Sequence, residues 1–240
     1  MTEPHFSRMT LKRDAAVVAP LIDALAPTDD GQAMAITHRL MWTVMPKAFQ
    51  DQRRSGESPF LWRAAERDKY YLLGPRPVDD SPFFRIETKP YRPDLAPGDR
   101  LAFDLRVNAT TNRKTGVGAD GRADRQRVDV AIDRLHAEEA EGATPASRAA
   151  RRELAARTAA EEWLRARQTR DGYRLEALKL AGYHVETLPR RARSAARIGV
   201  FDLQGLLVVE DPSAFVRRVL AGFGRAKAFG CGLMLLRRAS

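Results

Sequence analysis

The residues with the clearest capacity for chemistry lie near the C-terminus. Residues 222–232 read Gly-Phe-Gly-Arg-Ala-Lys-Ala-Phe-Gly-Cys-Gly and hold four of the 16 glycines. Glycines let backbone N–H groups turn toward a phosphate, and the two cations add positive charge. The segment lacks the Gly-Lys-Ser/Thr ending and the third glycine of nucleotide-binding fingerprints. We interpret it as a cradle for a phosphate, or alternatively as a permissive helix-to-strand turn; its candidate binding residues are Gly224, Arg225, Lys227, Gly230 and Gly232.

Two further groups of arginines precede this segment. One lies between predicted strands that end near Leu188 and begin near Ile198, contains no acidic residue, and consists of Arg190, Arg191, Arg193 and Arg197. Such a group at a hairpin tip suits a phosphate backbone. The other group lies on the predicted helix 146–168, where glutamates accompany the arginines. A solvated, salt-bridged helix face is the simpler interpretation there.

Histidine and cysteine are scarce, which limits the catalytic possibilities. His38 lies among apolar residues of a predicted helix, and on those grounds alone it is a core residue rather than a catalyst. We expect His136 in an acidic connector and His184 on the polar side of a strand. No metal-ligand spacing, nucleophile elbow or paired-carboxylate motif is present, so we expect no metal and no cofactor. Cys231 is the single cysteine, which excludes an intrachain disulfide.

The secondary-structure elements that must position these residues can be predicted from hydrophobic periodicity and from the placement of turn and helix-capping residues. Alternation or short apolar runs predict strands at 6–12, 60–63, 70–73, 83–87, 101–107, 175–188, 198–209 and 232–236. Helical spacing predicts helices at 32–45, ended by Pro46, at 146–168, and at 211–220, begun by Asp211-Pro212. Residues 108–127 contain three glycines and five basic side chains, and we expect a flexible loop.

The order of these elements indicates the fold class. They read β-α-β-β, a short β, and then β-α-β-β-α-β. The second half matches the ferredoxin-like split βαβ unit, and the first half resembles a reduced copy. We therefore predict an α+β protein with two tandem ferredoxin-like domains, one over residues 1–97 and one over residues 98–240.

Charge indicates the class of partner. The net charge is +10, and the halves differ, with +2 over residues 1–120 and +8 over residues 121–240. A genome-wide arginine bias would not be so uneven, so the second half is expected to bind a polyanion, with nucleic acid the first choice. No apolar run has membrane-spanning length and no signal-type segment is seen, so we expect no membrane partner and a cytoplasmic location.

Several segments together resemble one known family. Residues 222–236 are similar to the signature of the CasE-type CRISPR endoribonucleases of type I-E Cascade. The run His38 to Pro46 resembles the family's helix of His, then Trp four residues on, then Pro. Phe60-Leu-Trp-Arg resembles its following strand. Phe103-Asp-Leu-Arg-Val-Asn and Gln204-Gly-Leu-Leu resemble two further strands.

The resemblance carries specific expectations. It implies two ferredoxin-like domains and metal-independent cleavage of CRISPR repeat RNA beside its hairpin. The RNA's own 2′-hydroxyl is the nucleophile, and 5′-hydroxyl and cyclic phosphate ends result. It implies that the product's 3′ hairpin stays bound, with other Cascade subunits as partners. It also implies a catalytic His38, as general acid or base, beside the RNA-binding candidate Arg39.

One departure from the family pattern keeps alternatives open. Family members carry a tyrosine three residues before the histidine, and here that position is Ala35. Another group then assists His38, with Arg39 and Lys47 nearest in sequence, or the enzyme is slow. The main alternative is a non-catalytic subunit that binds the repeat hairpin within the same complex. A third possibility is an RNA-modifying or tRNA-processing protein on a similar scaffold.

Overall fold

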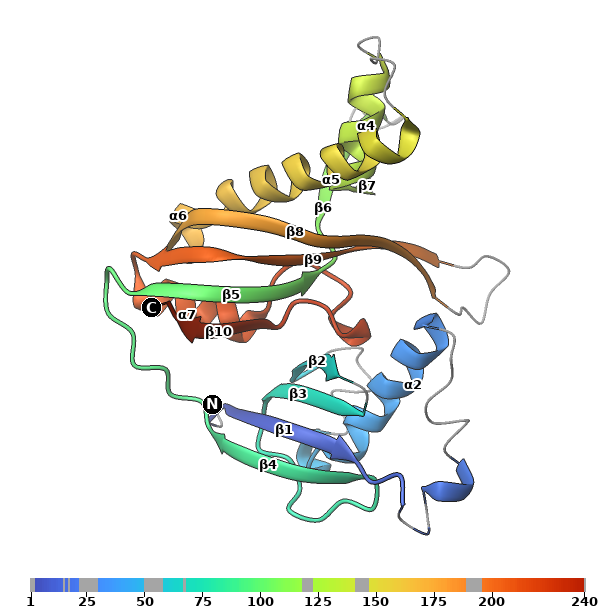
Figure 1. The fold of residues 1–240 in the computed structure, drawn as a ribbon, viewed down its shortest axis with the longest axis vertical. Coiled ribbons are helices and arrows are strands. Elements are labelled where there is room, and N and C mark those ends of the chain that lie inside the picture. The colour runs from blue at the N-terminus through green and yellow to red at the C-terminus, as the bar shows by residue number, and fades with distance from the viewer. Residues whose placement is uncertain are drawn as a thin grey trace. The chain divides into compact units, whose positions relative to one another are not determined.

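A computed structural model describes residues 3–14, 16, 18–21, 30–49, 58–66, 68–117, 123–140, 147–188 and 196–239 (Figure 1). The chain divides into two compact units that do not follow chain order. The first unit comprises Met1–Asp94, Glu186–Arg197 and Val216–Leu233. The second comprises Leu95–Val185, Ile198–Phe215 and Met234–Ser240. The first unit therefore includes the glycine-rich segment, which comes from late in the chain.

The first unit is built on a four-stranded sheet in the order β2-β3-β1-β4. Its strands are β1 (His5–Leu11), β2 (Leu61–Glu66), β3 (Lys69–Gly74) and β4 (Phe84–Pro90). The pairs β1–β3, β1–β4 and β2–β3 are antiparallel. Helix α2 (Asp30–Thr43) joins β1 to β2, and short 3₁₀ turns lie at Ala19–Leu21 and Lys47–Phe49.

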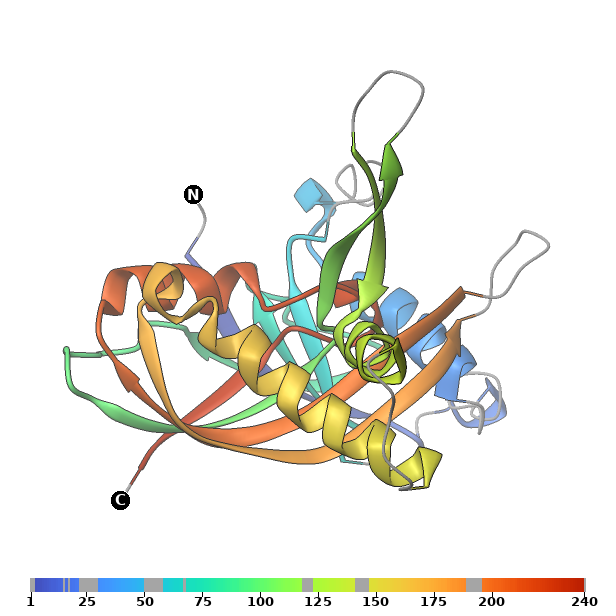
Figure 2. The same ribbon diagram turned by 90° about the horizontal axis from the view of Figure 1, so that it is seen from above.

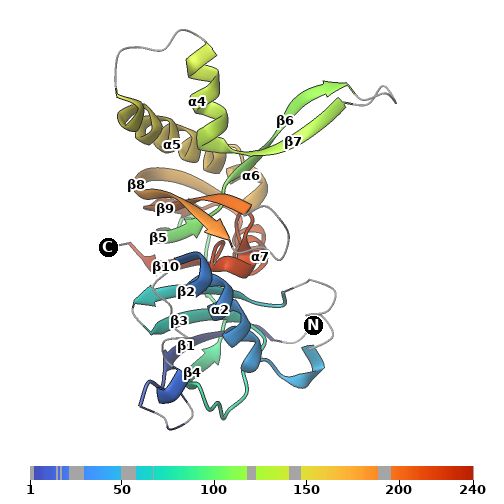
Figure 3. The ribbon, with the colours of Figure 1, turned by 90° about the vertical axis from the view of Figure 1, so that its right-hand side faces the viewer.

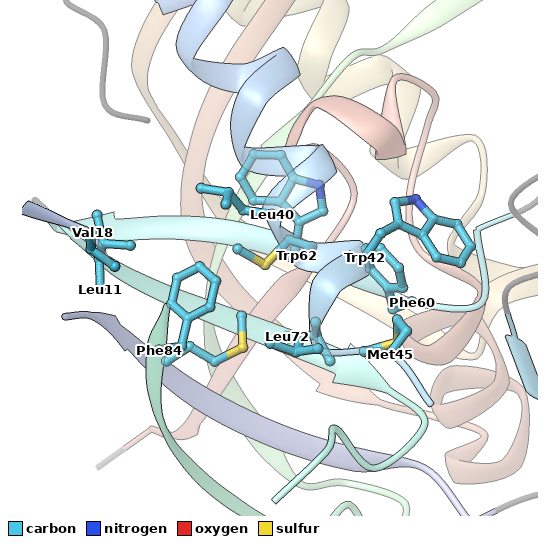
Figure 4. Close-up of a cluster of buried hydrophobic side chains, with 12 residues drawn as sticks. Leu11, Val18, Leu40, Trp42, Met45, Phe60, Trp62, Leu72 and Phe84 are labelled. Carbon is cyan, nitrogen blue, oxygen red and sulfur yellow. The ribbon is translucent and has the colours of Figure 1, made fainter. Parts of the chain in front are cut away.

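The core of the first unit lies between α2 and the sheet (Figure 4). Alternation along β1 buries Met9 and Leu11, while α2 contributes Leu40, Met41 and Trp42. Strand-side aromatic residues complete the cluster, and they are Phe60, Trp62 and Phe84. Because α2 and β2 share this core, residues on either element hold fixed positions relative to the other.

The second unit is built on a sheet in the order β10-β5-β9-β8. Its strands are β5 (Arg100–Val107), β8 (Tyr173–Leu188), β9 (Ala196–Val209) and β10 (Met234–Arg238). Strand β5 pairs antiparallel with both β9 and β10, and it buries alternate side chains from Leu101 to Val107. Helix α5 (Arg148–Arg165) lies along β8, and it is followed by α6 (Gln168–Asp171). Helix α7 (Pro212–Ala221) precedes β10.

Side chains cap the starts of α5 and α7. Ser147 accepts a hydrogen bond from the Ala150 N–H at the start of α5. Asp211 accepts one from the Ala214 N–H at 3.0 Å and so begins α7, as predicted. Trp163 lies on α5 and is buried, and its indole N–H donates to the Thr110 carbonyl at 3.2 Å.

The prediction of a flexible loop over residues 108–127 is wrong. Strands β6 (Thr110–Val117) and β7 (Ala123–Asp129) form an antiparallel hairpin that projects from the second unit's sheet (Figures 2 and 3). The strand signal is weak because the hairpin is polar on both faces, and periodicity detects a strand only when one face is apolar.

The expectation of an acidic connector around His136 is also wrong. Residues Val130–Ala140 form helix α4, and Asp129 caps it by accepting from the N–H groups of Ala131 and Ile132. Three buried residues, Val130, Ala131 and Leu135, supply its apolar side. Three apolar residues are too few to show a clear helical periodicity in the sequence.

Both sheets have the strand order of a ferredoxin-like fold, so the predicted fold class is confirmed. In each, the first strand lies between the third and the fourth, and the second strand is at an edge. The first unit lacks a helix between β3 and β4, where residues 75–83 connect the strands instead. The boundaries 1–97 and 98–240 stay a prediction, although the packing places residues 216–233 with the first unit.

Candidate active site and nucleic-acid interface

His38 lies on α2 between two buried aromatic rings of the first unit. Its Nε2 accepts a hydrogen bond from the Trp42 indole N–H, with 3.2 Å between the nitrogens. The His38 and Trp42 rings meet edge to face, with centroids 6.3 Å apart. On another side the Phe60 ring centroid lies 5.9 Å away. The imidazole is half-buried, so the structure holds it in one orientation without enclosing it.

The aromatic pair that holds His38 is itself fixed. Trp42 and Phe60 contact each other edge to face, with centroids 5.2 Å apart, and both are at most 3% exposed (Figure 4). Trp42 is one helical turn after His38, which is the spacing that brings two side chains of a helix together. Phe60 directly precedes β2. The sequence motif of His with Trp four residues later is therefore a side-chain contact.

The two residues that the sequence suggests as assisting His38 both have solvent-exposed side chains. Arg39 is exposed, and its Nε donates to the Ala35 carbonyl at 3.4 Å. Lys47 is exposed on the 3₁₀ turn after α2. Both side chains carry positive charge that a phosphate could contact, and their roles stay predictions.

The glycine-rich segment forms a closed loop, which we call the glycine-rich loop (residues 222–232). The Phe223 N–H donates to the Gly232 carbonyl at 2.9 Å and closes it. A 3₁₀ turn (Lys227–Phe229) lies inside it. Positive φ angles recur along it, at Gly222, Gly224, Gly230, Gly232 and the non-glycine Ala226. The backbone thus turns repeatedly in the way that glycine permits most easily.

Packing gives three of these glycines a structural reason as well. A β-carbon at Gly230 would lie 3.1 Å from the Trp62 ring, and one at Gly232 would lie 2.6 Å from the Phe223 carbonyl oxygen. At Gly222 it would meet the Leu61 side chain at 2.7 Å. Sequence reasoning raised the permissive turn as an alternative to an RNA cradle. The structure supports the turn, and the RNA contact stays a prediction.

The loop packs against the strand that lies beside the histidine. The Trp62 indole N–H donates to the Ala228 carbonyl at 3.3 Å, so strand β2 is linked directly to the 3₁₀ turn. Phe60 and Trp62 are two residues apart, and one contacts His38 while the other contacts the loop. Helix α2 also contacts the 3₁₀ turn. The first unit therefore brings together two candidate regions that are about 190 residues apart in sequence.

Three cations gather at the base of the loop. The Lys227 ammonium donates to the Ala221 carbonyl, and Arg218 donates to the Gly222 carbonyl at 3.4 Å. Burial lowers the pKa of Lys227, and the nearby charges of Arg218 and Arg225 lower it further. A bound phosphate would offset this repulsion and favour the charged ammonium. Arg218 was missed by sequence reasoning, because only the end of α7 brings it to the loop.

The arginine cluster between β8 and β9 is described only in part. Arg197 is exposed near the start of β9 and belongs to the first unit. Arg190, Arg191 and Arg193 lie outside the described residues. The interpretation of this cluster as a phosphate-binding hairpin tip stays a prediction.

Basic residues of the second unit separate into two kinds. On α5 and its neighbours, Arg165 pairs with Glu161 and Arg134 with Glu162, which is the salt-bridged face expected from sequence. The second kind lies on the β6–β7 hairpin, where three arginines are exposed among the described residues; they are Arg113, Arg125 and Arg127. Among them Arg113 has an acid nearby, with 3.7 Å to Asp133. The hairpin is a second basic surface that sequence reasoning treated as a loop.

Within the part of the chain that the structure describes, no three His, Cys, Asp or Glu side chains gather as a metal site would require. None of the described helices is long and apolar enough to cross a bilayer.

Comparisons with known proteins identify the class of fold. The CRISPR endoribonuclease Cse3 bound to 19 nt RNA superposes with a TM-score of 0.62 at 21% identity, covering 98% of this chain and 99% of that one. Cas6e from Escherichia coli K-12 gives 0.61 at 18% identity, covering 98% and 100%. A chain of a CRISPR RNA-guided surveillance complex gives 0.58 at 18% identity, covering 98% and 100%. No protein of curated function matches in sequence.

The family of CRISPR associated proteins matches residues 5–238, nearly the whole chain. The protein belongs to this family, and the family resemblance deduced from the sequence motifs is confirmed.

Proposed function

We propose that this protein is an endoribonuclease that cuts CRISPR repeat RNA next to its hairpin and keeps the product bound as a subunit of Cascade. The observation that carries the proposal is the convergence of His38 and the glycine-rich loop in one compact unit. Family membership supports it, as do the RNA-bound endoribonuclease and the surveillance-complex chain with the same fold.

The reaction needs no metal in this proposal. His38 transfers a proton, the 2′-hydroxyl attacks the neighbouring phosphorus, and the cut leaves a cyclic phosphate and a 5′-hydroxyl. Arg39, the glycine-rich loop and the arginines around Arg197 contact phosphates. The exposed arginines of the β6–β7 hairpin form a basic surface of the second unit that contacts phosphates as well. We place this work in the cytoplasm, with the repeat RNA and the other Cascade subunits as partners.

A labelled repeat RNA incubated with the protein in EDTA tests the proposal. Cleavage is expected to persist in EDTA and to stop when the nucleotide 5′ of the scissile phosphate is 2′-deoxy. Cutting of the deoxy substrate would exclude 2′-hydroxyl attack. Loss of cutting in EDTA that returns with a divalent ion would exclude the metal-independent chemistry.

A second function has one observation in its favour. Ala35 stands where the family pattern has tyrosine, so the site has one proton-transfer group fewer. A subunit that binds the repeat hairpin without cutting it would show tight, salt-sensitive RNA binding and no product under single-turnover conditions. The same labelled RNA distinguishes the two functions.

A further inference from the structure

We propose that Trp42 is a positioning residue that prepares His38 as the general base. By donating to Nε2, its indole keeps the imidazole neutral, with the proton on Nδ1 and the lone pair on Nε2. The inference deepens the proposed function, because it decides between the acid and base roles that the sequence leaves open.

The geometry of the pair is specific. The two nitrogens are 3.2 Å apart, and the rings are nearly perpendicular, with an interplanar angle of 83°. The indole therefore approaches through its N–H edge. Trp42 is 3% exposed and is held by Phe60, so it has little freedom to turn away. The hydrogen bond is part of the packed core and is formed before any RNA binds.

The tautomer follows from the chemistry of the donor. An indole nitrogen can donate a hydrogen bond and cannot accept one. The nitrogen that receives this bond must therefore present its lone pair, which leaves the proton of the neutral ring on Nδ1. Nδ1 is buried, so Nε2 is the nitrogen that can exchange its partner. The contact thereby determines which nitrogen takes part in proton transfer.

The same bond opposes protonation of the ring. An imidazolium carries N–H on both nitrogens, and its Nε2–H would face the Trp42 N–H, donor against donor. A hydrogen bond made only to the neutral form favours that form. Neutral imidazole can accept a proton, whereas a general acid would have to begin as imidazolium. The arrangement therefore favours the base.

In the reaction, the half-buried imidazole turns from the fixed indole toward the RNA, and the RNA 2′-hydroxyl becomes the donor to Nε2. Nε2 takes the hydroxyl proton as the 2′-oxygen forms a bond to phosphorus and the bond from phosphorus to the 5′-oxygen breaks. The departing 5′-oxygen takes a proton from water. In the free protein the Trp42 N–H thus holds Nε2 in the lone-pair form that it needs to accept the hydroxyl proton.

The other two tryptophans provide a comparison within the same chain. Each is buried and each donates its indole N–H, Trp62 to the Ala228 carbonyl and Trp163 to the Thr110 carbonyl. Both of those acceptors are backbone groups, which do not titrate. Trp42 alone of the three donates to a side chain that can take up a proton. Trp62→Phe is therefore a matched control, since it removes a buried indole donor from the same core without touching His38.

The first test is nuclear magnetic resonance of the free protein labelled with nitrogen-15. Long-range correlations from the ring protons distinguish a protonated from an unprotonated imidazole nitrogen, and His38→Gln assigns the signals among the four histidines. We expect Nδ1 to carry the proton of the neutral ring in the wild type and in the control variant Trp62→Phe. In Trp42→Phe we expect the proton to be shared between Nδ1 and Nε2. A proton on Nε2 in the wild type overturns the proposal, and that outcome needs neither RNA nor a folded variant.

The second test is the pH dependence of single-turnover cleavage at protein concentrations well below saturation, where the rate reports the protonation state of the free protein. The rate falls in acid as the base becomes protonated. Without the indole donor His38 protonates more easily, so in Trp42→Phe this fall should move to higher pH by about half to one unit. At high pH the rate should approach that of the wild type. Trp62→Phe should leave the midpoint of the fall unchanged, even if its melting temperature drops.

The outcomes separate this inference from the proposed function. If the wild type cuts RNA and Trp42→Phe shows an unmoved midpoint, the base role is overturned and the endoribonuclease stands. A shift to lower pH would also overturn it, because it would mean that the indole does not oppose protonation of His38. A rate that falls as the pH rises through the titration of His38 would show that the imidazolium is the active form. If the wild type never cuts RNA, the proposed function fails, whereas the resonance experiment still decides whether Trp42 sets the tautomer.

Discussion

The histidine site and the glycine-rich loop belong to the same compact unit, and they are built on different principles. At His38 one side chain is held by two buried rings through one hydrogen bond of 3.2 Å and aromatic contacts. In the loop the backbone supplies the shape through repeated positive φ angles, and the charge is spread over three cations. In the proposed function, the first region acts through a single nitrogen atom, whereas the second binds RNA through several groups.

This difference predicts how each region responds to substitution. Proton transfer in a transition state depends on one correctly placed group, so its removal costs rate and leaves ground-state binding intact. Phosphate contacts contribute in parallel, so the loss of one weakens affinity by a limited factor. The glycines fall between these extremes, because they act through the conformation on which the cations depend.

The largest effect is expected for His38→Ala. Single-turnover cleavage should fall by on the order of a hundredfold or more, with RNA affinity nearly unchanged, because the proposed reaction uses the imidazole for proton transfer. His184→Ala is a suitable control, since His184 is an exposed histidine on β8 of the second unit. Cleavage rates and filter binding of the same RNA measure both effects. A His38→Ala protein that cuts normally would show that another residue carries the proton.

Much of this arrangement could be predicted from sequence because apolar patterning encodes it. Strands β1 and β5 were found because their alternation buries every second side chain against a core. Helix α7 was found from the Asp211-Pro212 start, which has a local physical cause. The family resemblance identified His38, whereas its apolar neighbours alone indicated a core residue.

What the sequence could not provide depends on packing between distant segments. The contact of Trp62 with Ala228 joins residues 166 positions apart, and no local pattern encodes it. The gathering of Arg218 with Lys227 depends on where α7 ends. The β6–β7 hairpin was missed because both of its faces are polar. In each case the information lies in a tertiary contact or in the absence of an apolar face.

The glycines should give an intermediate effect, visible first in stability. Gly230→Ala introduces a β-carbon 3.1 Å from the Trp62 ring at a φ of +74°, and we expect a loss of about 1–2 kcal/mol in the free energy of unfolding. RNA affinity should weaken because the loop shifts. Gly98→Ala is the matched control, since Gly98 has a φ of +93° and nothing within 4 Å of its β-carbon position. It therefore isolates the backbone strain.

Thermal melting and RNA affinity of both variants distinguish the two roles of the loop. If Gly230→Ala loses affinity well beyond what its melting explains, the backbone itself approaches the RNA. If the folded variant binds normally, Gly230 serves the packing against Trp62, and the loop's contribution to binding comes from its cations alone.

The smallest effect per residue is expected for the cations. Arg225 is exposed on the glycine-rich loop, so Arg225→Ala should weaken hairpin and scrambled RNA alike and lower the log–log salt slope by roughly one unit. Arg197→Ala should behave in the same way. Arg85→Ala is the control, because Arg85 is exposed on β4, at the opposite sheet edge from the strand that contacts the loop. Cleavage at saturating RNA should be unchanged in all three, since none of them moves the proton.

A variant that loses binding to the cognate hairpin only, and still binds scrambled RNA, would contradict the prediction. That arginine would be reading a base, and affinity would then be concentrated at single side chains in the loop as catalysis is at His38.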